Sequence, residues 1–197
     1  MVIEEDLLIK FGADIINLGK NDLLFKKNDI PAYYYQIKKG RTKHVNVYAD
    51  KEFIQNFQTT GECVGDIFLF SSVAYPMSAV AMEDCTIVRL EKSIFFKLLR
   101  ANFEIQVQFF KHIADQVHFM YNILDSVKCN NAISCLKIFF DFLKKDHNCL
   151  EKYSCKIPYT RKEISTLTGM RIETVIRTLK KMEGESIIKI VQGKILY

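Results

Sequence analysis

The stretch that decides the fold lies near the carboxyl end of the chain, where residues 160–182 read TRKEISTLTGMRIETVIRTLKKM. Thr160 and, three residues later, Glu163 form the capping-box pattern that starts a helix. Gly169 stands where a tight turn between two helices needs a residue that tolerates a positive φ. A second helix is expected to begin near Arg171 and to stop at Gly184, the candidate left-handed residue after it. The stretch therefore predicts a helix-turn-helix.

The two faces of this second helix differ in chemistry. Val175, Leu179 and Met182 recur at spacings of four and three residues, which predicts a buried face. The opposite face is polar and basic, and such a face can enter the major groove of double-stranded DNA. The side chains expected to contact DNA are Thr160, Arg161, Arg171, Ile172, Glu173, Thr174, Arg177 and Lys180.

These side chains have different expected roles. Arg177 can donate two hydrogen bonds to guanine O6 and N7, and Glu173 can accept one from cytosine N4. Thr160, Arg161 and Lys180 suit phosphates, which set the register but carry no sequence information. The alternative is a surface pair of helices with solvated charges. We favour DNA binding because the cap, the turn glycine, the apolar face and the basic face agree.

Two further features support a nucleic-acid-binding module. Residues 187–196 read IIKIVQGKIL, which predicts a hairpin with a tight turn at Gln192-Gly193, as in a winged helix-turn-helix. The net charge of +5 is uneven, since residues 128–197 carry 14 Lys+Arg and 7 Asp+Glu, whereas residues 1–127 carry 14 and 16. A basic segment attached to a nearly neutral one is typical of a polyanion-binding module.

A heptad repeat precedes this module. Apolar residues recur at spacings of seven, three, four, three, four and three, which is the seam of a coiled coil and predicts a homodimer. The seam begins at Phe103, and its expected interface residues are Phe110, Ile113, Val117, Met120, Leu124 and Val127. The alternative is a helix lying on the preceding domain, since Ile105, Val107, Phe109, Phe119 and Ile123 form a second apolar face. Both arrangements can hold at once.

The first 98 residues predict a β domain. Short apolar runs alternate with turn signals at the spacing typical of a sandwich or barrel, and no long helical stripe interrupts them. The expected strands lie around residues 23–25, 33–37, 45–48, 53–57, 77–82 and 85–90. The predicted fold class is α+β, with an effector domain at 1–98, a dimerisation helix at 99–128 and a winged helix-turn-helix at 129–197.

Composition excludes several classes of protein. The 197 residues are 49% hydrophobic and 26% charged, which is globular rather than disordered or fibrous. No apolar run reaches the roughly 18–20 residues of a membrane span, and the acidic start MVIEEDLLIK lacks the basic region of a secretory signal. The six cysteines form no C-x-x-C pair, which predicts free thiols in a cytoplasmic protein. Cys129 and Cys135 are the candidate redox pair.

The chain resembles the Crp/Fnr family of bacterial transcription regulators over nearly its whole length. Residues 160–177 match the family pattern T-R-x-E-I…G…E-T-V-x-R. In the amino-terminal half, residues 61–70 (GECVGDIFLF) resemble G-(D/E)-x-(I/V)-G-E-x-x-L-F, and residues 75–85 (YPMSAVAMEDC) resemble Y-P-x-S-A-x-A-x-E-D. The resemblance implies a jelly-roll-like, double-stranded β-roll, a long dimer helix and a winged helix-turn-helix.

The departures from the family pattern concern the effector. Members that bind cyclic nucleotides hold the ribose with a Glu and neutralise the phosphate with an Arg directly before a Ser. Asp66 and Met77 occupy those positions here, and only Ser78 remains. A phosphate there would meet an uncompensated desolvation cost on the order of several kcal/mol. The resemblance thus implies an effector pocket around Gly65, Asp66, Met77 and Ser78 for an unidentified small molecule other than a cyclic nucleotide.

The resemblance also bears on cofactors and on the DNA site. The amino-terminal cysteine cluster of iron–sulfur sensors is absent, and His44, His112 and His118 are isolated in the sequence, so neither a metal nor haem is expected. The cyclic-AMP member has an Arg at the position of Ile172. The oxygen-sensor branch has an apolar residue there and favours TTGAT-like half-sites, so a palindrome with TTGA-like arms is expected.

Three other functions were compared with this one. A cupin-like β-barrel enzyme needs clustered histidine and carboxylate ligands, and the β segment contains His44 alone, so no enzymatic activity is expected. A constitutive DNA-binding regulator without a ligand is compatible with Met77 at the phosphate position. A thiol-sensing regulator is the third. A regulator bound to DNA would recruit or block RNA polymerase, the expected partner besides DNA and a second copy of the chain.

Overall fold

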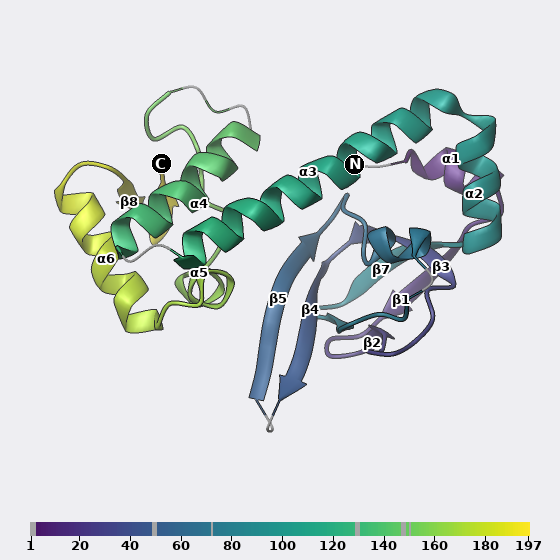
Figure 1. Ribbon diagram of the computed structural model, residues 1–197, viewed down its shortest axis with the longest axis horizontal. Coiled ribbons are helices and arrows are strands. Elements are labelled where there is room, and N and C mark those ends of the chain that lie inside the picture. Colours follow the sequence, from purple (N-terminus) through teal and green to yellow (C-terminus); the bar gives the residue numbers. More distant parts are fainter. Residues whose placement is uncertain (1–2, 49–50, 72, 129–130, 147–148, 150) are drawn as a thin grey trace. The chain divides into compact units, whose positions relative to one another are not determined.

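The computed structural model describes residues 3–48, 51–71, 73–128, 131–146, 149 and 151–197 (Figure 1). The chain forms two compact units, Met1–Asp115 and Gln116–Tyr197, and the boundary falls inside the long helix α3 (Phe103–Lys128). The predicted boundaries at 98 and 128 separate regions of different expected function, and they stay a prediction. Among the described residues, no helix is long and apolar enough to span a membrane.

Two antiparallel sheets make up the first unit. One sheet has the strand order β1 (Asp14–Leu18), β7 (Cys85–Glu91), β3 (Tyr33–Lys39). The other has the order β2 (Leu23–Phe25), β6 (Ser78–Ala81), β4 (Arg41–Tyr48), β5 (Lys51–Thr59). The long β4–β5 hairpin is plain in Figure 1. The predicted α+β class and its order of β domain, long helix and helix-turn-helix are confirmed.

Several elements of the first unit are absent from the sequence prediction, two helices and a strand among them. The helix α1 (Glu5–Lys10) and the strand β1 precede the first predicted strand, and the helix α2 (Lys92–Ala101) begins before the predicted end of the β domain at 98. The signal for α2 was readable, because Phe95, Leu98 and Leu99 follow helical spacing and are buried. The strand β1 instead depends on a partner, since Asp14 pairs in register with Arg89 and accepts hydrogen bonds from its guanidinium.

The sheet β1–β7–β3 has an apolar core on each face. Tyr35, Ile37 and Ile87 belong to a cluster that also contains residues of the other sheet. Tyr34, Val88 and Leu90 alternate with them and belong to a second cluster, which includes α2 and the first part of α3. The alternation follows from the two-residue period of a strand. As a result α3 packs on the β domain through Phe109, Ile105 and Ile113.

The second unit contains the second half of α3 and the predicted winged helix-turn-helix. The latter consists of α4 (Ala132–Asp146), α5 (Arg161–Thr168), α6 (Ile172–Gly184), β8 (Lys189–Val191) and β9 (Lys194–Leu196). Gly169 has a φ of 69° and closes α5, as predicted. Gln192 and Gly193 have φ values of 47° and 76°, which is the two-residue turn with both central residues left-handed that suits a hairpin. Both predicted turns are therefore confirmed.

The prediction for Gly184 was wrong. Gly184 is the last residue of α6, with Glu185 as its C-cap, and the left-handed residue is Ser186 at a φ of 57°. The amide of Ile187 donates to the carbonyl of Met182 at 2.8 Å, and the amide of Ser186 donates to that of Glu183 at 2.9 Å. These two bonds form a Schellman motif. Here the hydrogen bonds, and not the presence of a glycine, determine which residue is left-handed.

This helix ending gives the first testable prediction. Ser186→Gly removes the strain of a left-handed non-glycine residue and should stabilise the chain by about 0.5–1 kcal/mol. Gly184→Ala should also stabilise it, by about 0.5–1 kcal/mol, because Gly184 is helical and an added Cβ there meets nothing within 4 Å. Urea unfolding measures both changes. If Gly184→Ala destabilised the chain, Gly184 rather than Ser186 would be the left-handed residue.

Candidate nucleic-acid interface and sensor domain

The helix-turn-helix is held together by side-chain hydrogen bonds at its start and at its turn. The Thr160 hydroxyl accepts from the amide of Glu163 at 3.2 Å, and the Glu163 carboxylate accepts from the amide of Thr160 at 2.7 Å. The predicted capping box is thus confirmed. At the turn, the Ser165 hydroxyl donates to the carbonyl of Met170 at 2.7 Å. These bonds fix where α6 begins relative to α5.

The helix α6 presents a mixed polar face to solvent. Val175, Leu179 and Met182 are buried, as predicted, and Thr178 joins them. Ile172 and Thr174 are half-buried, whereas most other predicted DNA contacts are exposed: Thr160, Arg171, Glu173, Arg177 and Lys180. In the part of the chain that the structure describes, no salt bridge engages Arg177 or Lys180. Their charges are therefore available to a polyanion.

Sequence reasoning missed Ile176 on this face. Glu173, Ile176, Arg177 and Lys180 follow the spacing of one helical face, and the side chain of Ile176 is 38% exposed. An exposed apolar side chain between an acid and a base is suited to a thymine methyl group. The signal was legible, because Ile176 lies three residues after Glu173, outside the stripe of Val175 and Leu179. The apolar DNA contact expected from the sequence was Ile172 instead.

The wing is tied to both helices. The Arg161 guanidinium donates to the carbonyl of Gly193 in the hairpin turn at 3.0 Å. The amide of Ile190 donates to the carboxylate of Glu183 at 3.0 Å. Arg161, predicted to contact phosphate, therefore also positions the wing, and it is half-buried rather than exposed. This role was beyond the sequence, because Gly193 is distant from Arg161 along the chain.

Arg171 occupies the N-cap of α6 without capping it. Its backbone is extended, and its side chain makes no hydrogen bond to the first turn. Serine and asparagine are preferred at an N-cap because their oxygen accepts from these amides. The start of α6 is therefore weakly capped, and a feature other than stability favours an exposed cation there.

Arg171→Ser tests whether the exposed cation at this position lowers stability and strengthens DNA binding. The variant should gain about 1 kcal/mol of stability, because the serine oxygen caps α6, and should bind DNA several-fold more weakly, because a phosphate contact is lost. Urea unfolding and fluorescence anisotropy with a bound duplex measure the two effects. Lys181→Ser is the matched control, since it removes a cation from an exposed site of α6 that is not a cap. Equal stability changes in the two variants would refute the capping argument.

An apolar stripe runs along α3 away from the core of the first unit. The exposed residues lie at spacings of four, three, seven, four and three, as in a heptad seam with one position skipped. They are Phe103, Val107, Phe110, Val117, Tyr121 and Leu124, with Met120 beside them. Among the predicted interface residues, Phe110, Val117, Met120 and Leu124 lie on this exposed surface. Ile113 does not, because it packs against the apolar core, and the side chain of Val127 lies outside those described.

The residues of the predicted effector pocket lie beside a tight aromatic stack. The rings of Phe25 and Tyr75 stack with centroids 3.7 Å apart. A Cβ added to Gly65 would lie 2.9 Å from each of them, so only glycine fits there. Met77 is buried, and the Ser78 hydroxyl accepts from the amide of Lys27 at 2.9 Å. Gly65 therefore packs directly against the Phe25–Tyr75 stack, and Met77 and Ser78 lie two and three residues after Tyr75 in the chain.

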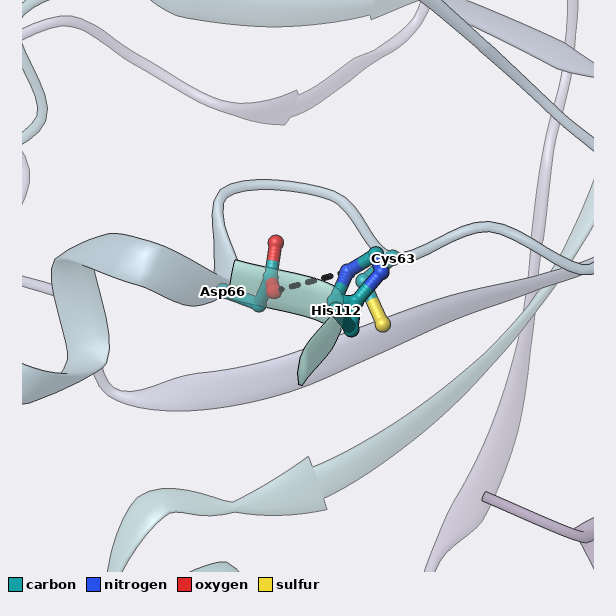
Figure 2. Close-up of side chains that lie close together, drawn as sticks. All are labelled: Cys63, Asp66 and His112. Atoms are coloured by element: carbon teal, nitrogen blue, oxygen red, sulfur yellow. Dashed lines mark ion pairs between the residues drawn. The ribbon is translucent and has the colours of Figure 1, made fainter. Parts of the chain in front are cut away.

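Asp66, the fourth residue of the predicted pocket, pairs with a side chain of α3. It is 2% exposed, and its Oδ2 lies 3.2 Å from Nε2 of His112 on α3. The Sγ of Cys63 belongs to the same group, and the three ligand atoms lie within 4.8 Å of one another (Figure 2). Burial and the nearby Asp66 carboxylate raise the pKa of the Cys63 thiol well above its usual range. The sequence analysis expected no metal ligands and did not join these residues.

The interior of the β domain contains polar atoms without partners. Among the described residues, His44 Nε2, Asn46 Oδ1 and the Tyr75 hydroxyl are buried and have no hydrogen-bond partner. His44 and Asn46 share one face of β4, and Phe25 lies next to both His44 and Tyr75, at ring-centroid distances of 6.0 and 3.7 Å. Buried polar groups are nearly always paired, so these three atoms require an explanation.

The charge state of His44 is set by burial. Desolvation lowers its pKa to about 4, against a smaller opposing effect of Asp66. The ring is therefore neutral at pH 7. Its Nδ1 lies 3.1 Å from the amide nitrogen of Gln58, which only donates, so the ring proton resides on Nε2. The three unpaired atoms are then one donor, one acceptor and one hydroxyl, and none of them is charged.

His44 predicts a pH dependence of stability. Its folded pKa of about 4 lies below the unfolded value of 6.5. The unfolded chain thus binds more protons between these values, and the stability that is present above pH 6.5 is lost as the pH falls toward 4. Between pH 7 and pH 5 the loss should be about 2 kcal/mol more than in His44→Leu. Urea unfolding at the two pH values measures it, and equal losses would contradict it.

The structure brings together two thiols that were not paired from the sequence. Cys129 lies outside the described residues, so the predicted pair with Cys135 has no structural description. Cys149 and Cys155 lie within hydrogen-bond reach instead, and burial together with Cys149 raises the pKa of Cys155 to about 11. The backbone of Cys155 pairs with Tyr197 next to the wing.

Comparison with known families divides the chain in the same way. Residues 15–102 match the cyclic nucleotide-binding domain, and residues 140–196 match the Crp-like helix-turn-helix domain. The "Anaerobic regulatory protein" of Haemophilus influenzae is 23% identical over 186 residues, which cover 90% of this chain and 69% of that protein.

Solved structures show the same fold at low sequence identity. A CooA variant from Carboxydothermus hydrogenoformans has a TM-score of 0.78 and 19% identity, and the match covers 98% of this chain and 87% of that one. FixK2 from Bradyrhizobium japonicum has a TM-score of 0.71 and 17% identity, and the match covers 93% and 91%. These likenesses extend through both units of the chain.

Proposed function

Because this chain belongs to the Crp/Fnr family of transcription regulators, we propose that it reads a palindromic DNA site as a homodimer and so controls transcription. The observation that carries this proposal is the outward face of α6, where Glu173, Ile176, Arg177 and Lys180 are exposed together. Two such faces, related by the two-fold axis of a dimer, would read half-sites about one helical turn apart. The protein would act in the cytoplasm. When bound to its DNA site, the dimer would recruit or block RNA polymerase.

The α3 stripe supports the dimer. Its exposed apolar residues span six turns of one helix and are flanked by polar side chains, and an exposed apolar seam of this length is unusual in a monomer. A second copy of α3 would cover it with the same residues, as two-fold symmetry requires.

The half-site is proposed to contain TTGA. Arg177 and Glu173 are available for a guanine and a cytosine, and the apolar Ile172 and Ile176 suit thymine methyl groups. Selection of bound sequences from a random duplex pool, at a stated moderate salt concentration, tests this reading. Enrichment of a palindrome with TTGA-like arms is expected. A palindrome with other arms would refute our assignment of the base contacts. Salt-sensitive binding without enrichment of any sequence would refute the proposed function.

The effector is proposed to be a small uncharged polar molecule bound inside the β domain. The unpaired atoms of His44, Asn46 and Tyr75 offer neutral hydrogen bonds, and Met77 stands where an anionic phosphate would need a cation. Thermal unfolding with cyclic AMP and with neutral polar metabolites tests this, because a ligand of the folded state raises the midpoint. We expect no shift with cyclic AMP. If no compound shifts the midpoint and the palindrome binds without addition, the chain is a constitutive regulator.

A thiol response is the second candidate, favoured by the contact between Cys149 and Cys155. A disulfide between them would form as a thiol oxidant takes up two electrons and the two thiol protons, and it would connect residues beside the wing. DNA affinity measured before and after treatment with diamide tests it. A change that is abolished by Cys149→Ser supports a redox regulator, and an unchanged affinity excludes one at this pair.

A further inference from the structure

Cys63, Asp66 and His112 converge on one point between the β domain and the first half of α3. Cys63 follows β5 and forms a bridge to Gln36 of β3, Asp66 opens the 3-10 helix η1 (Asp66–Phe70), and His112 lies on α3. Figure 2 shows the sulfur, carboxylate and imidazole side chains side by side. All three residues belong to the first unit of the chain.

The distances approach those of a metal centre. Zinc binds sulfur at about 2.3 Å and imidazole nitrogen or carboxylate oxygen at about 2.0–2.2 Å, so neighbouring ligand atoms of a tetrahedral site lie about 3.3–3.6 Å apart. His112 Nε2 and Asp66 Oδ2 are 3.2 Å apart already. The Cys63 sulfur lies within 4.8 Å of both, so a shift of about one ångström completes the triangle.

The ligand types select the metal. A thiolate, an imidazole and one carboxylate form the mixed sulfur, nitrogen and oxygen set of zinc and its neighbours, whereas magnesium and calcium require oxygen ligands. A divalent cation also balances one thiolate and one carboxylate, so the loaded site carries no net charge. Neutrality matters because Cys63 and Asp66 are 5% and 2% exposed, and a buried net charge is costly.

The surroundings can support such a site. The Tyr34 hydroxyl lies 3.2 Å from the Cys63 sulfur and 2.8 Å from Oε1 of Gln36, and the Gln36 amide donates to the carbonyl of Ile3 at 3.0 Å. The single proton of this hydroxyl goes to Gln36, so its oxygen accepts from the Cys63 thiol. Once that thiol has lost its proton to a metal site, the hydroxyl would turn from Gln36 to donate to the thiolate, and such an outer contact orients the ligand. His112 is 20% exposed, which leaves a path for the ion from solvent.

We propose that Cys63, Asp66 and His112 bind one zinc-class divalent cation, with a water molecule in the fourth position. On binding, Cys63 loses its thiol proton to solvent and coordinates as the thiolate. The ion connects the first half of α3 to the β domain beside Phe109 and Ile113, which pack against the same core. An occupied site fixes the rotation of this half of the helix about its own axis and therefore the direction in which Phe103, Val107 and Phe110 face. The binding itself does not depend on the proposed function.

Titration of the metal-free full-length chain with Co²⁺ tests this proposal, because thiolate-bound cobalt has a near-ultraviolet charge-transfer band and intense visible bands. We expect one Co²⁺ per chain, displacement by Zn²⁺, and loss of the charge-transfer band in Cys63→Ser. His112→Gln should bind at least tenfold more weakly. Cys85→Ser and His118→Gln are the matched controls, a buried cysteine of the same domain and another histidine of α3, and both should bind like the unchanged chain.

Thermal unfolding keeps the test independent of a variant that fails to fold. Zn²⁺ should raise the unfolding midpoint of the unchanged chain and of His118→Gln by several degrees, and should leave that of His112→Gln unchanged. His112 is partly exposed, so this substitution is the one least damaging to the core. The proposal is overturned if the unchanged chain shows no charge-transfer band, or if the band survives in Cys63→Ser and disappears in Cys149→Ser.

Discussion

A chain with Val117→Glu is expected to sediment as a monomer and to bind its palindrome roughly a hundredfold or more weakly than the unchanged chain. Val117 lies in the middle of the exposed α3 stripe and is 44% exposed in the isolated chain. In a two-fold dimer the substitution would place two carboxylates against each other in an apolar seam. A monomer engages one half-site at a time and loses the gain of linked binding, which is on the order of 10²–10⁴.

Gln108→Glu is the matched control, because it adds the same charge at an exposed position of α3 outside the stripe. It should remain a dimer and should bind DNA nearly as the unchanged chain does. Analytical ultracentrifugation and fluorescence anisotropy measure the two properties. A Val117→Glu chain that stays dimeric would show that α3 does not form the interface, and the dimer would then need another surface.

The register of this stripe shows how far a heptad pattern leads. The sequence alone favoured Phe110, Ile113, Val117 and Met120, whereas the structure exposes Val107 and Tyr121 and turns Ile113 to the core. Both seams follow spacings of three and four, and they share residues. The choice between them depends on which face the β domain covers, and that contact is tertiary.

Local signals predicted most of the fold. The capping box at Thr160, the turn at Gly169 and the hairpin turn at Gln192-Gly193 each depend on residues a few positions apart, and all were confirmed. The strand β1 could not be predicted in this way, because its polar residue Asp14 is paired by Arg89 from a distant strand. Ser186, and not Gly184 as predicted, is the left-handed residue after α6, because the hydrogen bonds at the helix end determine that position.

The candidate sites divide along the same line. The DNA face of α6 was readable, since helical spacing places Glu173 and Arg177 on one side, and Ile176 was missed only because apolar residues are assigned to cores by default. The group of Cys63, Asp66 and His112 had no sequence signal, because His112 comes from a helix far along the chain. A buried cysteine, aspartate and histidine acquire a shared chemistry only when the fold brings their atoms together.

Arg177→Ala is expected to weaken binding to the selected palindrome by about 2–6 kcal/mol. A bidentate contact to guanine contributes about 1–3 kcal/mol of discrimination, and a dimer makes it twice. The larger part of the loss should be specific, because the guanidinium is exposed on α6, where it can reach a base edge. Competition between the palindrome and a duplex with the guanine replaced measures it: the unchanged chain should discriminate strongly, and Arg177→Ala weakly.

Lys180→Ala separates base reading from charge. Lys180 is also exposed on α6 and is expected to contact phosphate, so its loss should weaken binding to both duplexes equally and reduce the salt dependence by about one unit per subunit. Arg177→Ala should instead flatten the preference between the duplexes. If both variants reduce the affinity for every duplex alike, Arg177 is a phosphate contact, and the specificity resides in Glu173, in Ile176 or in the shape of the DNA.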